Sequence, residues 1–172
     1  KKKHRLAQQR KAMQKTKALI DYSIIEKMVE DIKRAGKICI FASGLSRYAA
    51  LPFVKKMQYL NRLVLLSEDR DSSRLLAENL SENDVAIFLT LSAKTETIIE
   101  SYHIALQKKA KISVITGLGQ SLLSHESQTI YIYSKNRFKN DIDFTSRMPM
   151  EYIFEYIFDI YFKKKLAHRF KK

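Results

Sequence analysis

The sequence predicts an α/β fold, a three-layer α/β/α sandwich with a five-stranded parallel sheet, doubly wound in the flavodoxin-like manner. Five short apolar runs alternate with helical segments along the chain, and this alternation is typical of βαβ units. The runs are apolar almost throughout, as expected of strands that helices cover on both faces. With 172 residues, of which 45% are hydrophobic and 29% charged, the chain is long enough for one such domain.

The first helical segment covers residues 6–35, a stretch without proline or glycine. Apolar residues recur at intervals of three and four from Ile20 to Ile32, so the later half of the segment is amphipathic. Gly36 follows in the position of a C-terminal cap and ends the helix. We therefore expect one long helix before the first strand.

The remaining strands and helices alternate up to a polar loop at residues 134–145, which precedes the last helix. Pro52 lies near the second turn of the helix after the first strand, so we expect that helix to start late or to bend. The strands are predicted at residues 37–42, 63–66, 85–91, 112–116 and 129–133. The helices between and after them are predicted at residues 49–60, 71–80, 96–109, 121–125 and 146–165.

The net charge of +14 lies entirely at the two ends of the chain. Residues 1–17 hold eight basic residues and no acid, and residues 163–172 hold six more basic residues and no acid. Between them, 18 basic residues match all 18 acidic ones, so the folded body lacks the basic excess of a nucleic-acid-binding surface. The ends are either solvated or adjacent to an acidic partner, such as DNA held by a neighbouring module.

Other composition features point to a cytoplasmic protein that holds no metal and no cofactor. Cys39 is the only cysteine, so the chain can form neither an internal disulfide nor a cysteine-built zinc site, which fits a reducing compartment. No apolar targeting segment follows the basic N-terminus. The most apolar segment, residues 148–162, is too short to span a bilayer and carries an acidic stripe.

Two loops rich in hydroxyl groups follow neighbouring strands and lead into helices. Residues 43–46 read Ser-Gly-Leu-Ser, and residues 90–95 read Thr-Leu-Ser-Ala-Lys-Thr. A helix start offers free N–H groups and a positive dipole end, and hydroxyl groups add donors, so the pair of loops suits a phosphate dianion. The simpler alternative is that Ser46 and Thr95 only cap their helices. A Gly-x-Gly-x-x-Gly fingerprint and a Walker A loop are absent, which disfavours nucleotide binding.

The order of these motifs resembles a SIS (sugar isomerase) domain over residues 20–166. The resemblance implies that Thr90, Ser92 and Thr95 hold the phosphate group of a sugar phosphate. Ala93 stands where the family's third-strand motif has glycine, and Ala42 replaces the first glycine of the first loop. Either methyl group could narrow or weaken the site.

Within that family, the chain is similar to the effector domain of RpiR-type (MurR/RpiR) transcriptional regulators. Ser146-Arg147 at the start of an apolar last helix, and the long helix before the first strand, carry this resemblance. It implies a sugar-phosphate sensor that forms a homodimer or a higher oligomer. DNA would bind only to an N-terminal helix-turn-helix domain that this chain, which starts at Lys1, does not contain. We divide the chain into a basic helical linker (residues 1–19), the SIS domain (20–166) and a basic tail (167–172).

Two alternatives to a sensor remain. An aldose–ketose isomerase needs an acid and a base, and Glu68 is the best candidate base, whereas His103 and His125 fit surface or packing roles. The domain could also be a dimerisation module with a degenerate pocket, since the last helix carries six aromatic residues in eleven and needs cover on most faces. The candidate ligand-binding residues are Ser43, Gly44, Ser46, Arg47, Glu68, Thr90, Ser92, Thr95 and Arg147.

Two of these candidates are arginines, and each has a second possible role. Arg47 follows the first loop directly, so it could reach a phosphate group or remain solvated at the helix start. Arg147 could reach a pocket across a dimer interface or pair with a neighbouring acid.

Overall fold

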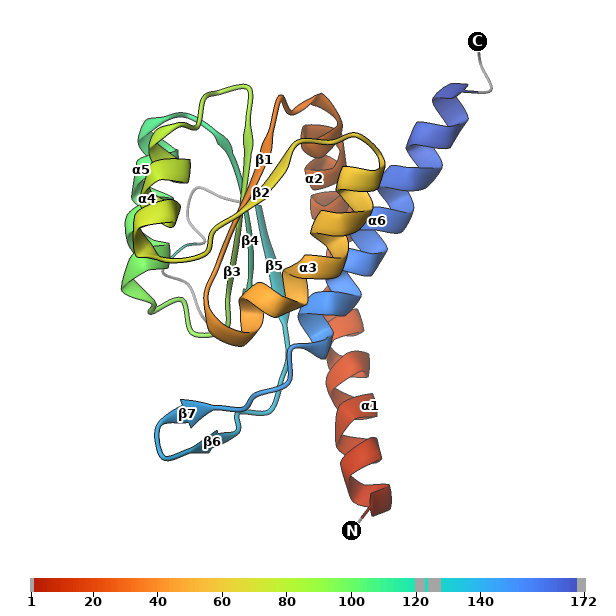
Figure 1. Cartoon of the computed structure of the whole chain (residues 1–172). Coiled ribbons are helices and arrows are strands. Elements are labelled where there is room, and N and C mark those ends of the chain that lie inside the picture. The colour runs from red at the N-terminus through yellow and green to blue at the C-terminus, as the bar shows by residue number, and fades with distance from the viewer. Residues whose placement is uncertain (1, 120–122, 124–127, 170–172) are drawn as a thin grey trace.

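The five-stranded parallel sheet predicted from the sequence is present in the computed structural model, which describes residues 2–119, 123 and 128–169. The strands lie in the order β2-β1-β3-β4-β5, and every neighbouring pair is parallel (Figure 1). This confirms the predicted fold class. The strands are β1 (Ile38–Ala42), β2 (Val64–Leu66), β3 (Val85–Thr90), β4 (Lys111–Gly117) and β5 (Gln128–Ile132).

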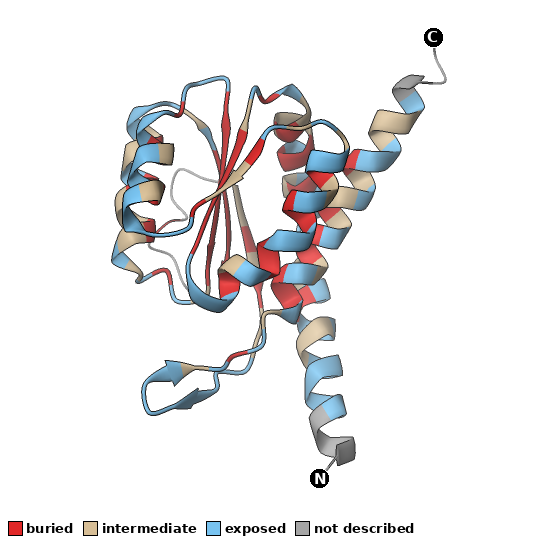
Figure 2. Ribbon diagram, viewed as in Figure 1, coloured by how far each residue is buried: buried red, intermediate tan, exposed pale blue. Residues whose placement is uncertain are grey.

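Helices cover both faces of this sheet and create two buried clusters (Figure 2). Because side chains alternate along a strand, Ile38 and Ile40 belong to one cluster and Cys39 and Phe41 to the other. Burial raises the pKa of the Cys39 thiol to about 11, so this cysteine packs as a small apolar residue. The first face is covered by α2 (Tyr22–Arg34), α3 (Gly44–Tyr59) and α6 (Met148–Arg169), and the second by α4 (Arg70–Glu78) and α5 (Glu96–Gln107).

The expected single helix before the first strand is wrong, because the chain forms two helices with a break at Ile20–Asp21. The first is α1 (Lys2–Leu19), and α2 follows it. Asp21 is the N-cap of α2, and its carboxylate accepts the backbone N–H of Ser23 at 2.9 Å. An aspartate that satisfies a free N–H group stabilises a new helix start, so the break needs neither glycine nor proline.

Of the two expectations for the helix around Pro52, a late start or a bend, the late start is wrong. The α3 helix begins at Gly44 and continues through Pro52 to Tyr59. A proline inside a helix leaves the carbonyl four residues earlier without its usual partner. That residue is Tyr48, which lies on the exposed side of α3.

A small antiparallel hairpin stands where the sequence predicts only a polar loop. Its strands are β6 (Phe138–Lys139) and β7 (Ile142–Asp143). The hairpin projects beyond the carboxyl ends of β1 and β3 (Figure 1). Asn140 and Asp141 form the turn with φ values of 49° and 61°, as a two-residue hairpin turn requires. The predicted helix at residues 121–125 lies outside the described residues, apart from Leu123. Among the described helices, none has the length and apolarity needed to cross a membrane.

Candidate functional site

The order of the strands places the two hydroxyl loops side by side. The chain passes from β1 out to β2 and then returns to β3 on the other side of β1, so a crevice opens between β1 and β3. Ala42 lies opposite Leu89 in the sheet, and the loops that begin at Ser43 and Thr90 therefore leave it next to each other. A cavity of about 780 Å³ opens there. It is lined by Ser43, Gly44, Leu45, Ser46, Tyr48, Leu89, Thr90, Leu91, Ser92, Lys94, Thr95, Asn136, Phe138, Ile142, Asp143, Phe144, Thr145 and Arg147.

The two helices that start at this cavity have no side-chain cap. Ser43 is the N-cap residue of α3 and Thr95 that of α5, and neither hydroxyl group bonds to its helix start. By contrast, aspartates cap α2 and α4, and Asp69 forms a capping box at the start of α4. Ser46 lies within the first turn of α3, and Thr95 forms no side-chain cap bond, so neither hydroxyl group caps its helix. Two helix starts with unused hydroxyl groups and N–H groups face one cavity, as an anion site requires.

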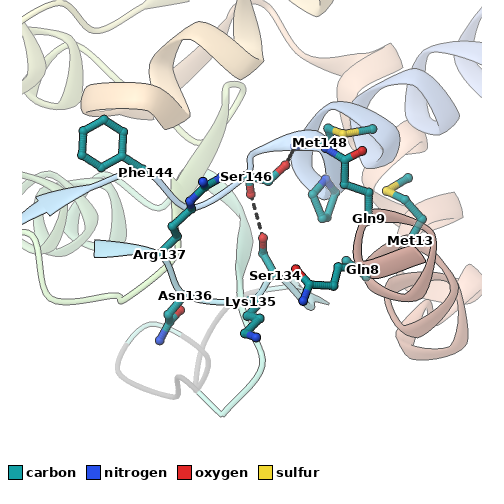
Figure 3. A pocket seen from close by; sticks show the side chains of 12 residues that line it. Gln8, Gln9, Met13, Ser134, Lys135, Asn136, Arg137, Phe144, Ser146 and Met148 are labelled. Atoms are coloured by element: carbon teal, nitrogen blue, oxygen red, sulfur yellow. Dashed lines mark hydrogen bonds between the residues drawn. The ribbon is translucent and has the colours of Figure 1, made fainter. Parts of the chain in front are cut away.

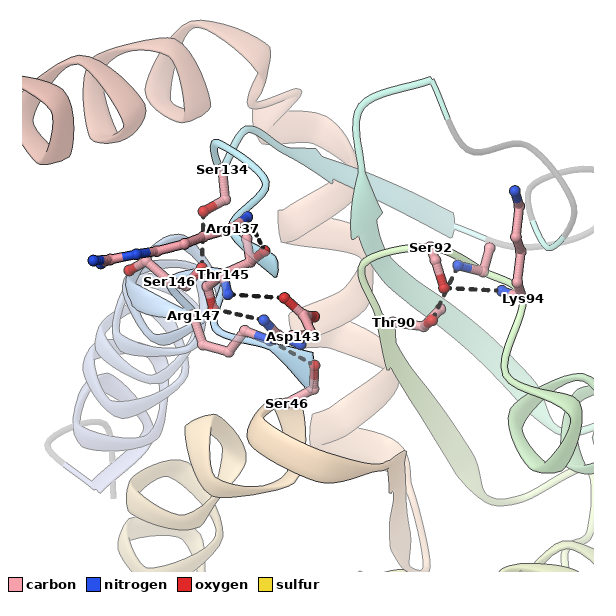
Figure 4. A network of polar contacts seen from close by, with 11 residues as sticks. Ser46, Thr90, Ser92, Lys94, Ser134, Arg137, Asp143, Thr145, Ser146 and Arg147 are labelled. Carbon is pink, nitrogen blue, oxygen red and sulfur yellow. Dashed lines mark hydrogen bonds and ion pairs between the residues drawn. The ribbon is translucent and has the colours of Figure 1, made fainter. Parts of the chain in front are cut away.

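The turn after β3 is organised by its own hydroxyl groups. Thr90 Oγ1 accepts the Ala93 N–H at 3.0 Å, and Ser92 Oγ accepts the Lys94 N–H at 3.3 Å (Figure 4). Ala93 has a φ of 52°, a left-handed conformation that glycine adopts at much lower energy than alanine. Its methyl group is buried in the cluster of α4 and α5 and does not line the cavity, so it does not narrow the site. Ala42, in β1, is likewise buried and outside the cavity wall.

Gly117 lets the end of β4 lie against the same turn. A Cβ atom at this position would stand 2.5 Å from the carbonyl oxygen of Leu91, closer than any side chain could tolerate. Glycine is therefore required for β4 to support the start of the loop that carries Ser92.

Arg147 joins the first loop to the hairpin (Figure 4). Its Nε donates to Ser46 Oγ at 3.1 Å, its Nη1 to the Thr145 carbonyl at 2.6 Å and its Nη2 to Asp143 Oδ2 at 2.7 Å. Burial raises the pKa of Asp143, but hydrogen bonds from Arg147 and Thr145 outweigh this and hold it below its usual value. Arg147 thus lines the cavity of its own chain and also pairs with a neighbouring acid.

Arg47 and Glu68 are not among the residues that line the cavity. The Arg47 Nε donates to the Ser67 carbonyl at 2.9 Å, and its Nη2 lies 3.5 Å from Glu68 Oε1. The Glu68 side chain is 74% exposed, so this is a weak surface ion pair beside β2. His103 is exposed on α5, with its ring against that of Tyr102, and His125 lies outside the described residues.

The cavity thus gathers seven predicted residues: Ser43, Gly44, Ser46, Thr90, Ser92, Thr95 and Arg147. The wall formed by the hairpin and its stems was missed, because its strands are too short to show a period. The Asn140-Asp141 pair between Phe138 and Ile142 was the one signal for a turn. Within the described ranges, no three His, Cys, Asp or Glu side chains come together as a metal site.

A family model described as the SIS domain matches residues 31–153, which include both loops and the start of α6. The chain belongs to the SIS domain family. The HTH-type transcriptional regulator HexR of Escherichia coli is 27% identical to this SIS domain over 103 residues, or 60% of the chain and 36% of HexR. The chain therefore spans only about a third of the length of that relative.

Solved structures of regulators and of isomerases share the fold. The Vibrio vulnificus NanR protein, complexed with ManNAc-6P, has a TM-score of 0.80 at 17% identity, over 92% of this SIS domain and 61% of that chain. The sugar isomerase domain of an RpiR transcription factor from Sphaerobacter thermophilus has a TM-score of 0.78 at 13% identity, with coverages of 91% and 87%.

The phosphoheptose isomerase GmhA of Neisseria gonorrhoeae has a TM-score of 0.72 at 14% identity, with coverages of 93% and 96%. The predicted similarity to RpiR-type regulators is confirmed, and this SIS domain shares its fold with sugar-phosphate isomerases as well.

Proposed function

We propose that this SIS domain binds the phosphate group of a sugar phosphate between the starts of α3 and α5. The observation that carries the proposal is the pair of helix starts without side-chain caps that face one cavity from adjacent strands. The hydroxyl groups of Ser43, Ser92 and Thr95 supply further donors, and Lys94 on the cavity wall adds a positive charge. The complex of the related NanR protein with ManNAc-6P supports a sugar phosphate as the ligand class.

We further propose that the domain senses this ligand in a transcriptional regulator of the RpiR type and does not catalyse a reaction. An isomerase needs a base and an acid beside the sugar. In the described cavity wall, the only carboxylate is that of Asp143, which is tied to Arg147, and no histidine is present. Glu68, the candidate base, points into solvent beside β2. DNA binding would belong to a separate helix-turn-helix domain of the whole regulator, as the similarity to HexR suggests.

Thermal unfolding of the purified domain with a panel of hexose and amino-sugar phosphates tests the ligand class. A true ligand at about 100 times its Kd raises the free energy of unfolding by about 2.7 kcal/mol. Ser92→Ala should abolish the shift, whereas Ser23→Ala, on α2 and away from the cavity, should retain it. No stabilisation by any member of the panel, or an undiminished shift in Ser92→Ala, contradicts the proposed site.

Turnover separates the sensor from the isomerase. The folded domain is expected to bind a panel member without converting it, as followed by the exchange of the C2 proton in heavy water. Conversion of an aldose phosphate to its ketose, dependent on a residue of this chain, would identify an enzyme.

A further inference from the structure

The cavity is much larger than a phosphate group needs. Its volume of about 780 Å³ falls in the range of pockets that hold whole small molecules. The hydroxyl loops form one wall, and the opposite wall consists of the hairpin and its stems, residues 136–147. If the phosphate group binds at the loops, the rest of the ligand must lie against the hairpin.

The hairpin presents apolar side chains that nothing in the described structure covers. Phe138 is 62% exposed, Ile142 59% and Phe144 50%, and all three line the cavity. A two-stranded hairpin of this size is marginally stable, and exposed apolar groups at a cavity mark a binding surface.

Phe138 stands on the hairpin face that hydrogen bonds connect to the first phosphate loop. Phe138 lies directly opposite Asp143 in the hairpin, and residues opposite each other share a face. Arg147 donates a hydrogen bond to Asp143 and another to Ser46 at the start of α3. The Phe138 ring therefore stands on the face that the Arg147 network directs toward the first loop. Ile142, on the other face, also lines the cavity, whereas Lys139, which lies opposite it, does not.

Asn136 places an unused amide group on the wall of the same cavity. Its side chain is exposed and makes no hydrogen bond with any described residue. Asn136 and Phe144 also line a second cavity of about 380 Å³, between α1 and the hairpin stems (Figure 3). The stem is thus open to solvent on both sides, although Ser134 Oγ fastens it to the Ser146 carbonyl at 2.9 Å.

We propose that the β6–β7 hairpin recognises the sugar moiety of the ligand and determines which sugar phosphate binds. This inference rests on the proposed phosphate site. The Phe138 ring covers a C–H face of the sugar, because the face of an aromatic ring is electron-rich and attracts C–H groups. The Asn136 amide, which can donate and accept, pairs with sugar hydroxyl groups or with an N-acyl substituent. Asp143 keeps the hairpin in place through Arg147.

Isothermal titration of the whole chain tests this assignment with glucose 6-phosphate, N-acetylglucosamine 6-phosphate and inorganic phosphate as probes. Phe138→Ala is expected to weaken the tighter sugar phosphate about tenfold, and to change the affinity for inorganic phosphate by less than about twofold. Asn136→Ala should change the ratio of the two sugar-phosphate affinities. Lys139→Ala, in the same hairpin but outside the cavity wall, serves as the matched control and should behave as the wild type.

Each other result overturns the assignment in a recognisable way. Unchanged sugar-phosphate binding in Phe138→Ala and Asn136→Ala removes the hairpin from recognition but leaves the phosphate site intact. An equal loss for inorganic phosphate and sugar phosphate shows that the hairpin only supports the loops. If the wild type binds none of the three probes, the proposed function fails, and the hairpin assignment fails with it.

Discussion

Arg147 and Ser46 are 101 positions apart in the chain, yet the Arg147 Nε donates to Ser46 Oγ at 3.1 Å. This bond joins the start of α3 to the segment that precedes α6, and the same guanidinium group reaches Asp143 in the hairpin. Ser46 accepts this bond and still has its own O–H group to donate to a phosphate. It holds an arginine whose positive charge lies on the wall of the cavity. The phosphate loop, the hairpin and the last helix thus depend on one side chain.

Replacement of this arginine should lower the free energy of unfolding by more than the loss of a single exposed ion pair would. We predict that Arg147→Lys costs about 2 kcal/mol of the free energy of unfolding, because an ammonium group cannot replace three charge-assisted donors of fixed geometry. Urea denaturation measures the loss. Arg74→Lys is the matched control, since its pair with Glu78 is exposed on both sides and should contribute almost nothing. Equal losses in both variants would show that the Arg147 network stabilises the fold no more than an exposed ion pair does.

The ion pair also predicts a dependence of stability on pH. The pKa of Asp143 lies below 3.8, so its ionised form stabilises the fold at pH values above its unfolded pKa. This contribution disappears as the pH falls through the lower pKa of the folded state. The difference in unfolding free energy between wild type and Asp143→Asn should therefore be large at pH 6 and shrink below pH 3.8. A difference that is constant between these values would mean that Asp143 does not titrate with unfolding.

The left-handed conformation of Ala93 gives a prediction in which three effects nearly cancel. Ala93→Gly relieves a strain of about 1–2 kcal/mol. It also loses about 0.8 kcal/mol of buried methyl group and about 0.5–1 kcal/mol of chain entropy. We therefore expect stability to change by less than about 1 kcal/mol. Ala93→Val, by contrast, places a β-branched residue at positive φ and should be severely destabilising. Thermal unfolding of both variants checks this, and a tolerated valine would contradict it.

The sequence alone was sufficient for the sheet and for most of the phosphate loops. Buried strands such as residues 85–90 are apolar at every position, and the hydroxyl groups follow them directly. The hairpin could not be predicted, since two-residue strands such as Phe138–Lys139 show no period. The position of Arg47 was equally hidden, because only the folded chain shows that the Ser67 carbonyl and Glu68 lie within its reach.

The outer side of α6 supports the proposal that the domain forms a dimer. The inner side of this helix, which includes Ile153 and Phe154, is buried against the sheet and α3. Phe158 packs partly against the same cluster, and its ring stacks on that of Phe162 with the two centroids 5.7 Å apart. Phe162 itself remains 38% exposed. A second copy that covers these rings would remove them from water and so stabilise a dimer.

We predict that the domain dimerises through this part of α6 and that Phe162→Glu makes it monomeric, because a dimer would have to bury the new carboxylate against apolar groups. Analytical ultracentrifugation over a range of concentrations measures the change. Leu75→Glu is the matched control: Leu75 is 62% exposed on α4, across the sheet from α6, and its replacement should leave the dimer intact. A wild-type domain that stays monomeric at high concentration, or a Phe162→Glu variant that remains dimeric, would remove α6 from the interface.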